Sequence, residues 1–292
     1  MKASYFTFGP QESGSRYCQG SPIQTRHTRL IVYIVSTVCS VFVNFLVTCI
    51  AMSGVAFAQN NANDLVRQTQ QLLLRGEIAA AKATLQQVAK NDQEAPSVIF
   101  EQALLDDAEG RHEQARKNYD HLQAGPLANA AAVPSAVNLV AVGQFKQAGK
   151  AFKQLSASQD SYVAGYAQLW QLWLAARTRE GSSAVHRAKL AETASRIRAA
   201  SPQQEAIGRL YAGEGSVGAV FTAIDGMSFS DPLQRRNARS EAAFFAGGYL
   251  QYVRRDYPAA MRLYQQELSQ PGASIERPLL AKALASLPAA TR

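Results

Sequence analysis

The chain has 292 residues, of which 47% are hydrophobic and 18% are charged, so it can bury a sizeable core in one elongated domain or two compact ones. Its formal net charge is +8, but no basic run is interleaved with aromatic residues, which excludes the usual footprint of a nucleic-acid-binding protein. All three cysteines (Cys18, Cys39 and Cys49) precede residue 59, so the rest of the chain has no disulfide, thiolate metal site or cysteine nucleophile.

The N-terminal segment, residues 1–58, has the order of a secretory signal. Arg26 and Arg29 precede a long apolar run that contains no charged side chain. The run ends in the small-x-small motif Ala-Phe-Ala, which is typical of a signal cleavage site. We therefore predict cleavage between Ala58 and Gln59 and export of the remaining chain to the periplasm.

Two other fates of this segment stay open as alternatives. The apolar run, residues 30–58, is longer than a usual signal core and long enough to cross a bilayer, so it is also compatible with an uncleaved anchor in the inner membrane. Leu46-Val47-Thr48-Cys49 has the apolar start of a lipidation motif, although Thr48 stands where a smaller residue is expected. The basic lead would stay inside, so residues 59–292 are expected to face the periplasm, with membrane contact only through residues 30–58.

Three copies of one pattern follow, and neighbouring copies are 34 and 33 residues apart. In each copy a glycine is followed five residues later by alanine, and four residues after that by a large apolar or aromatic residue. The copies are Gly76, Ala81 and Leu85; Gly110, Ala115 and Tyr119; and Gly143, Ala148 and Phe152. Glycine suits a turn with positive φ, alanine lets two antiparallel helices approach, and the large residue fills the space against the next repeat. We predict three helical hairpins within residues 59–158.

Residues 159–292 are expected to form a C-terminal helical region that departs from this pattern. Predicted helices cover residues 162–177, 184–200, 203–211, 216–224 and 233–254. The pattern returns near Asp256, where Ala260 and Tyr264 occupy the alanine and aromatic positions, and an amphipathic helix over 275–287 would cap the array. No stretch predicts a β-sheet. The predicted fold class is all-α, a solenoid of helical hairpins with an irregular helical middle.

The repeat spacing resembles that of the tetratricopeptide family across residues 64–155 and 240–270. The second half also resembles the NlpI-like bacterial envelope lipoproteins. The segments that carry this resemblance are Tyr166–Trp170, Arg209–Ser216, Ser240–Tyr249 and Ile275–Arg277. The resemblance implies a helical scaffold that faces the periplasm and acts as an adaptor for proteases and cell-wall hydrolases. The chain departs from that group in its lipidation motif and in its long N-terminal lead.

Residue types that carry catalytic chemistry do not form a recognisable motif. The four histidines lack an HExxH, CxxC or paired-carboxylate pattern. Gly213–Gly218 lacks the preceding strand and the following Lys-Ser/Thr of a phosphate loop, so it predicts a turn. The acidic cluster Asp106, Asp107 and Glu109 is expected to be a solvated helix end. We expect no catalytic residue, no cofactor and no metal ion, and therefore predict that the protein is not an enzyme.

Candidate partner-binding residues lie on the first helices of the predicted hairpins, which would line a concave groove. The polar or amphipathic residues on these helices are Gln68, Gln71, Glu101, Gln102, Asn138, Gln251 and Tyr252. Of these, Gln102, Asn138, Gln251 and Tyr252 are the predicted partner-binding residues. Trp170 and Trp173 share one helix face and are candidates either for interface anchors or for core packing. We predict a non-catalytic adaptor for other envelope proteins that also self-associates through exposed repeat ends. A structural or assembly subunit of a secretion, pilus or polysaccharide-export machine is the alternative.

Overall fold

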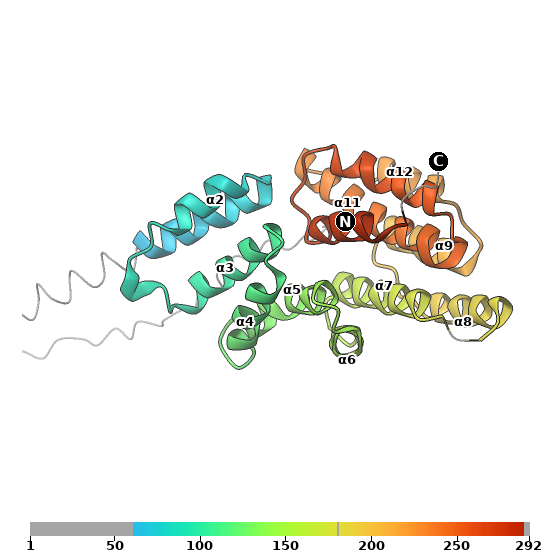
Figure 1. Ribbon diagram of the computed structural model, residues 1–292, viewed down its shortest axis with the longest axis horizontal. Helices are drawn as coiled ribbons and strands as arrows, with labels where there is room; N and C mark the ends of the chain where they lie inside the picture. The colour runs from blue at the N-terminus through green and yellow to red at the C-terminus, as the bar shows by residue number, and fades with distance from the viewer. Residues whose placement is uncertain (1–60, 180, 289–292) are drawn as a thin grey trace, which may run out of the picture.

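The computed structural model describes residues 61–179 and 181–288, and every regular element in these ranges is a helix (Figure 1). The all-α class predicted from the sequence is therefore confirmed for the described residues. A first helix covers 61–75, and the elements after it are α2 (Ile78–Leu85), the short η1 (Lys90–Asp92), α3 (Pro96–Ala108), α4 (His112–Leu122), α5 (Ala128–Ala141), α6 (Phe145–Leu155), α7 (Ser161–Arg177), α8 (Ser183–Ser195), α9 (Pro202–Ala212), α10 (Val217–Asp225), α11 (Pro232–Gly248), η2 (Tyr249–Arg254), α12 (Tyr257–Leu268) and α13 (Arg277–Ser286).

The N-terminal predictions fall outside the described residues. They concern the signal or anchor segment 1–58, cleavage between Ala58 and Gln59, and lipidation of Cys49, and they stay predictions. Within residues 61–179 and 181–288, no helix combines the length and the apolar character that a bilayer span requires.

Helices that follow one another in the chain pack together as successive hairpins. The pairs include α3 with α4, α5 with α6, α9 with α10 and α11 with α12, and α13 packs on α12. Figure 1 shows the chain running from α2 through α3, α5 and α7 to α8, and then returning through α9, α11 and α12. This return brings α13 into contact with α3, so the last helix closes against the second hairpin of the array.

The repeat positions occupy equivalent places in successive hairpins. Gly110 ends α3 with a φ of 78°, a left-handed conformation that side chains disfavour, and Gly76 and Gly143 end the corresponding helices at 76° and 78°. The alanines and large residues that follow are buried, at Ala81, Leu85, Ala115, Tyr119, Ala148, Phe152, Ala260 and Tyr264. The alanines therefore let paired helices approach, and the larger side chains fill the space between neighbouring hairpins.

An aromatic cluster around Trp170 forms the core of the second half. The Trp170 ring stacks on Phe152 of α6 with 5.0 Å between centroids, and its centroid lies 4.9 Å from that of Phe244 in α11. Trp173 packs on the same Phe244 ring at 5.3 Å. Both indoles are buried, with 0% and 5% of their surface exposed. The two tryptophans therefore hold α7 between α6 and α11.

Two glycines at the end of α11 allow this close packing. A Cβ atom on Gly248 would lie 2.3 Å from Nε1 of Trp173, and one on Gly247 would lie 2.0 Å from a ring carbon of Tyr264. Neither position can hold a larger residue without a shift of the neighbouring ring. The helix predicted over 233–254 is present, but it changes type, because the α-helical pattern ends at Gly248 and a π-helical turn continues to Arg254.

Candidate functional site

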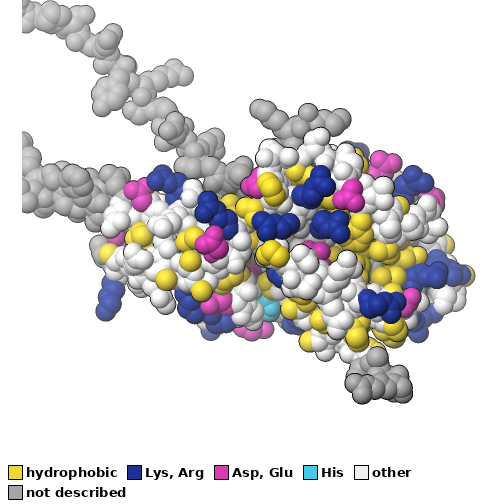
Figure 2. All heavy atoms as spheres, turned by 90° about the horizontal axis from the view of Figure 1, so that it is seen from above, with side chains coloured by type: hydrophobic (Ala, Val, Ile, Leu, Met, Phe, Trp, Pro, Cys, Tyr) yellow, Lys and Arg dark blue, Asp and Glu magenta, His cyan; other side chains and the backbone are white. Residues whose placement is uncertain are grey.

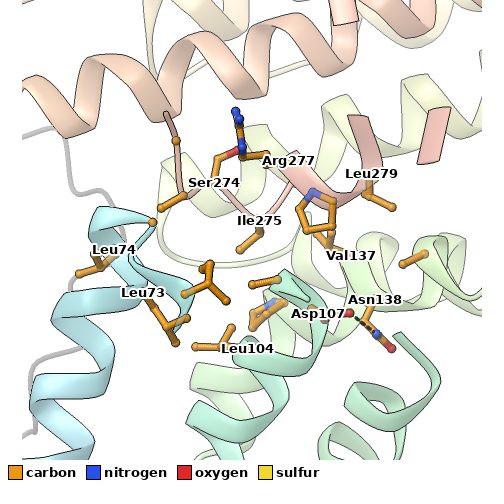
Figure 3. A pocket seen from close by; sticks show the side chains of 18 of the residues that line it. Leu73, Leu74, Leu104, Asp107, Val137, Asn138, Ser274, Ile275, Arg277 and Leu279 are labelled. Atoms are coloured by element: carbon orange, nitrogen blue, oxygen red, sulfur yellow. Dashed lines mark hydrogen bonds between the residues drawn. The ribbon is translucent and has the colours of Figure 1, made fainter. Parts of the chain in front are cut away.

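A cavity of about 490 Å³ lies between the N-terminal hairpins and the C-terminal end of the chain (Figure 3). Its walls come from the end of the 61–75 helix, from α3 and α5, and from the strap, which we define as residues 269–276 between α12 and α13. Apolar side chains dominate the walls, among them Leu73, Leu104, Val137, Ile275 and Leu279. A mostly apolar cavity of this size with a few polar groups is typical of a ligand-binding pocket.

The strap is held in place by hydrogen bonds on both sides of Ile275, which Figure 3 shows pointing into the cavity. The guanidinium of Arg277 donates to the carbonyl oxygens of Glu267 and Leu268 at 3.2 and 2.7 Å, and so caps the C-terminus of α12. The backbone N–H of Ala273 donates to Oδ1 of Asn237 at 3.3 Å. These contacts fix one wall of the pocket to α11 and α12.

Glu101 of α3 lines the pocket, and only 3% of its surface is exposed. Its Oε2 atom is buried and has no hydrogen-bond partner among the described residues. Burial disfavours the charged form and raises the pKa of Glu101 to about 8. At neutral pH most molecules therefore carry a neutral glutamic acid here, inside an apolar cavity.

Asn138 of α5 supplies a second unpartnered acceptor to the same pocket. Its Nδ2 donates to Oδ1 of Asp107 at 2.7 Å and to the carbonyl oxygen of His112 at 2.9 Å. Two acceptors on one side fix that side as the amide nitrogen, so Oδ1 is the atom left over. This Oδ1 is buried and has no hydrogen-bond partner in the described part of the chain.

Asp107 connects the polar groups at this end of the pocket. Its Oδ1 also lies 2.8 Å from Nδ1 of His112. Burial is the main cause that raises the pKa of Tyr119 well above its ordinary value, and the nearby Asp107 carboxylate raises it further. The Tyr119 hydroxyl therefore stays protonated in the physiological range. Asp107 is already engaged by its neighbours, which distinguishes it from Glu101.

The acidic cluster at the end of α3 is not a solvated helix end, which corrects the sequence prediction. The carboxylate of Asp106 is 2% exposed and accepts hydrogen bonds from Arg111 at 2.6 and 3.0 Å and from Asn118 at 3.1 Å. Glu109 accepts from Nζ of Lys82 at 3.0 Å and also pairs with Arg111. Burial raises the pKa of Glu109, but the hydrogen bonds from Lys82 and Arg111 outweigh it and lower the pKa. The cluster thus ties α2 to the turn between α3 and α4.

The six predicted partner-binding residues do not form one site. Asn138 is the only one of the six that lines the pocket, and the half-buried Gln102 of α3 donates to Asp106 at 3.0 Å. Gln251 is buried and accepts from the Tyr264 hydroxyl at 3.2 Å, while the half-buried Tyr252 packs edge-on against Trp173 at 5.6 Å. Trp170 and Trp173 are buried among other rings, which agrees with the core-packing alternative and not with a role as interface anchors.

Two further buried carboxyls, Glu241 of α11 and Glu276 of the strap, were not singled out from the sequence. The Tyr162 hydroxyl donates to Glu241 at 3.0 Å, and the Tyr166 hydroxyl donates to Glu276. Burial raises the pKa of both carboxyls, and the charge of Glu276 further raises the pKa of Glu241. These contacts attach the end of the strap to α7 and α11.

The molecular surface carries mixed charge. Figure 2 shows Lys and Arg side chains in several groups on one face, with acidic and hydrophobic side chains between them. Arg235 and Arg239 of α11, for example, lie 3.7 and 3.5 Å from the carboxylate of Asp225. Among the described residues, no group of three or more His, Cys, Asp or Glu side chains is arranged to hold a metal ion.

Glu101 was one of several polar positions on the predicted groove-facing helices, and the sequence did not distinguish it from its neighbour Gln102. It shares the pocket lining with the strap, which lies more than 160 residues further along the chain. Local spacing therefore could not assign it to a pocket. Compared with known proteins, the chain matches no family model and no curated protein sequence.

Proposed function

We propose that the chain is a non-catalytic, tetratricopeptide-like scaffold of the bacterial cell envelope. It binds a segment of another envelope protein in the pocket between its N-terminal hairpins and the strap. The observation that carries the proposal is the apolar cavity of about 490 Å³ with the unpartnered Glu101 in its wall. The export signal predicted in residues 1–58 supports the location, and the repeat spacing supports the family.

The composition of the pocket favours binding over catalysis. Its walls are mostly aliphatic and supply apolar surface for a partner side chain to bury. Its polar groups include the unpartnered acceptors of Glu101 and Asn138, which can orient a bound group. His112 and Asp107 contact each other, but no serine, cysteine or lysine that could act as a nucleophile lies in hydrogen-bond contact with His112 among the described residues.

A capture experiment with the full chain tests this function. Leu104→Trp places a larger side chain into the pocket, because Figure 3 shows Leu104 directed toward the cavity. Val185→Trp adds the same ring at a position on α8 that is 60% exposed and distant from the pocket wall. Each chain is immobilised and exposed to an envelope extract, and captured proteins are identified by mass spectrometry.

We expect proteins that bind wild type and Val185→Trp equally to be lost or reduced at least about tenfold with Leu104→Trp. Circular dichroism melts check that both variants stay folded. If the Leu104→Trp chain is folded and captures the same proteins in the same amounts, the pocket is not the binding site and the proposal fails.

A further inference from the structure

Four buried side-chain atoms in the pocket lining have no hydrogen-bond partner among the described residues: Oε2 of Glu101, Oδ1 of Asn138 and the hydroxyl oxygens of Tyr119 and Ser274. Each of them can accept a hydrogen bond, and the residues Glu101 and Asn138 are 3% and 1% exposed. A buried polar atom without a partner costs free energy, so each is expected to find one when the pocket is occupied. The occupant should therefore bring hydrogen-bond donors.

The charged and titratable groups around Glu101 are already directed elsewhere. On α4, His112 contacts Asp107, and Arg116 pairs with Asp120 and Ser135. On α13, the guanidinium of Arg277 donates hydrogen bonds to backbone carbonyl oxygens of α12. The remaining groups in the lining or beside it are Arg75 at the end of the 61–75 helix and the Tyr119 hydroxyl.

None of these groups is hydrogen-bonded to Glu101 in the described part of the chain. An anion next to Glu101 would require this carboxyl to stay protonated and would share the lining with the carboxylate of Asp107, which disfavours a carboxylate or a phosphate there. A cation would instead meet a carboxyl group that has no counter-charge. Apolar walls next to this carboxyl require that the cation be attached to an apolar stem.

We propose that the pocket receives the side chain of a lysine in an apolar segment of the partner protein, with the ammonium group at Glu101. The proposal names the anchor of the interaction described under Proposed function and rests on it for the source of the lysine. An ammonium group is compact and has three donors, so it suits acceptors on two separate side chains better than the rigid fork of an arginine. Its four-carbon stem can lie along aliphatic walls such as those of Leu104 and Val137.

Binding of the ammonium group is coupled to the loss of one proton from Glu101. The neutral Glu101 carboxyl releases its proton to solvent, the carboxylate forms, and the ammonium group keeps all its protons. No bond other than the carboxyl O–H is broken. The ion pair then lies in a pocket whose lining also includes Asn138.

Three small probes with the same apolar chain test the chemistry without any partner protein. They are hexylammonium, 1-hexanol and hexanoate, titrated calorimetrically into the purified full chain at pH 8.5. We expect hexylammonium to bind about tenfold or more tightly than 1-hexanol, and hexanoate to bind most weakly. The proposal is overturned if 1-hexanol or hexanoate binds as well as hexylammonium, or if none of the three binds.

Glu101→Gln keeps the shape of the side chain and removes its charge, and Glu113→Gln is the matched control at an exposed position on α4. The Glu101→Gln variant should lose about tenfold in affinity for hexylammonium and stay within about twofold of wild type for 1-hexanol. Unchanged binding of 1-hexanol shows that the pocket is still folded. Retention of the preference for hexylammonium in Glu101→Gln would also overturn the proposal.

A peptide comparison then identifies the source of the cation. Two short peptides, rich in leucine and alanine, differ only in a central lysine or methionine, and we expect the lysine peptide alone to compete with hexylammonium. If hexylammonium binds and the lysine peptide does not, the assignment to a protein lysine is wrong and the pocket binds a small amine. Because the probes need no envelope partner, this outcome differs from a failed capture experiment, which concerns the proposed function.

Discussion

The turn after the first helix contacts the backbone of the strap, since a Cβ atom on Gly76 would lie 3.0 Å from the carbonyl oxygen of Gly272. The two glycines are separated by almost the whole described chain. Their approach closes one side of the pocket, because both belong to its lining. The helical array therefore returns on itself, and its two ends share one cavity.

Gly76→Ala should destabilise the protein more than Gly110→Ala. Both glycines have a left-handed φ, at 76° and 78°, and alanine there costs about 1–2 kcal/mol. Gly110 has free space for a methyl group, whereas Gly76 meets the Gly272 carbonyl, which adds roughly 1–3 kcal/mol. Urea unfolding followed by circular dichroism measures the difference. Equal losses in the two variants would show that the strap does not contact this turn.

Gly248→Ala should be costly because its methyl group would overlap the indole of Trp173 at 2.3 Å. Overpacking of this kind lowers the stability by about 1–3 kcal/mol. The indole ring of Trp173 would have to move, so the tryptophan fluorescence should also change. Gly218→Ala is the matched control, an exposed glycine in α10 with open space around it. This control should stabilise the protein by about 0.5–1 kcal/mol through helix propensity. A Gly248→Ala chain as stable as wild type would contradict the packing of α11 on α7.

Affinity for hexylammonium should increase with pH in the range where Glu101 titrates. The pKa of Glu101 is raised to about 8 by burial, so below this value the site must first lose a proton before it pairs with a cation. Affinity should therefore fall about tenfold per pH unit well below 8, or roughly a hundredfold between pH 9 and pH 6. Glu101→Gln separates this effect from His112, which the variant keeps. A variant as pH-dependent as wild type would show that another group is responsible.

Stability should depend on pH through the buried pair Glu241 and Glu276. Burial raises the folded-state pKa of Glu241 above its ordinary value of 4.5, so the folded chain holds a proton that the unfolded chain releases. This contribution to stability is complete below about pH 4.5 and is lost as the pH rises toward the folded-state pKa. Glu241→Gln should therefore lose less stability than wild type between pH 5 and pH 9. Thermal melts across this range, with Glu113→Gln as an exposed control, measure the effect. Parallel curves for wild type and Glu241→Gln would refute it.

The predicted export signal has a simple mass-spectrometric test. If residues 1–58 are cleaved as a signal peptide, the intact mass of the chain recovered from cells should correspond to a mature N-terminus at Gln59. An anchor would keep the full mass and sediment with membranes. Lipidation would instead begin the chain at Cys49 and add acyl mass. Recovery of the full-length chain from the cytosol would contradict export in all these forms.

Much of the local fold could be read from spacing alone. Gly110, Ala115 and Tyr119 are close in sequence, and their roles as turn, close contact and filler follow from the geometry of a single hairpin. The helices predicted over 203–211 and 233–254 begin one residue earlier, at Pro202 and Pro232, because proline suits the first helical turn. Helix existence and most helix positions were therefore set by interactions within about ten residues.

The candidate site depended on contacts that no local pattern contains. Glu101 lines the same pocket as the strap, although the two are far apart in the chain, and Asp106 is an ion-pair partner because Arg111 folds back on it. From the sequence alone, Trp170 could lie at an interface or in the core. It lies in the core because α6 and α11 both pack against its ring.

The sequence by itself determined the helices and their pairing into hairpins, because alanine, glycine and aromatic spacing acts within one supersecondary unit. Only the tertiary structure decided where the chain closes. The contact between Gly76 and Gly272 joins residues far apart in the chain, and such a contact is set by the accumulated angles of every hairpin between them. The pocket, and the burial that leaves Glu101 neutral, follow from that closure.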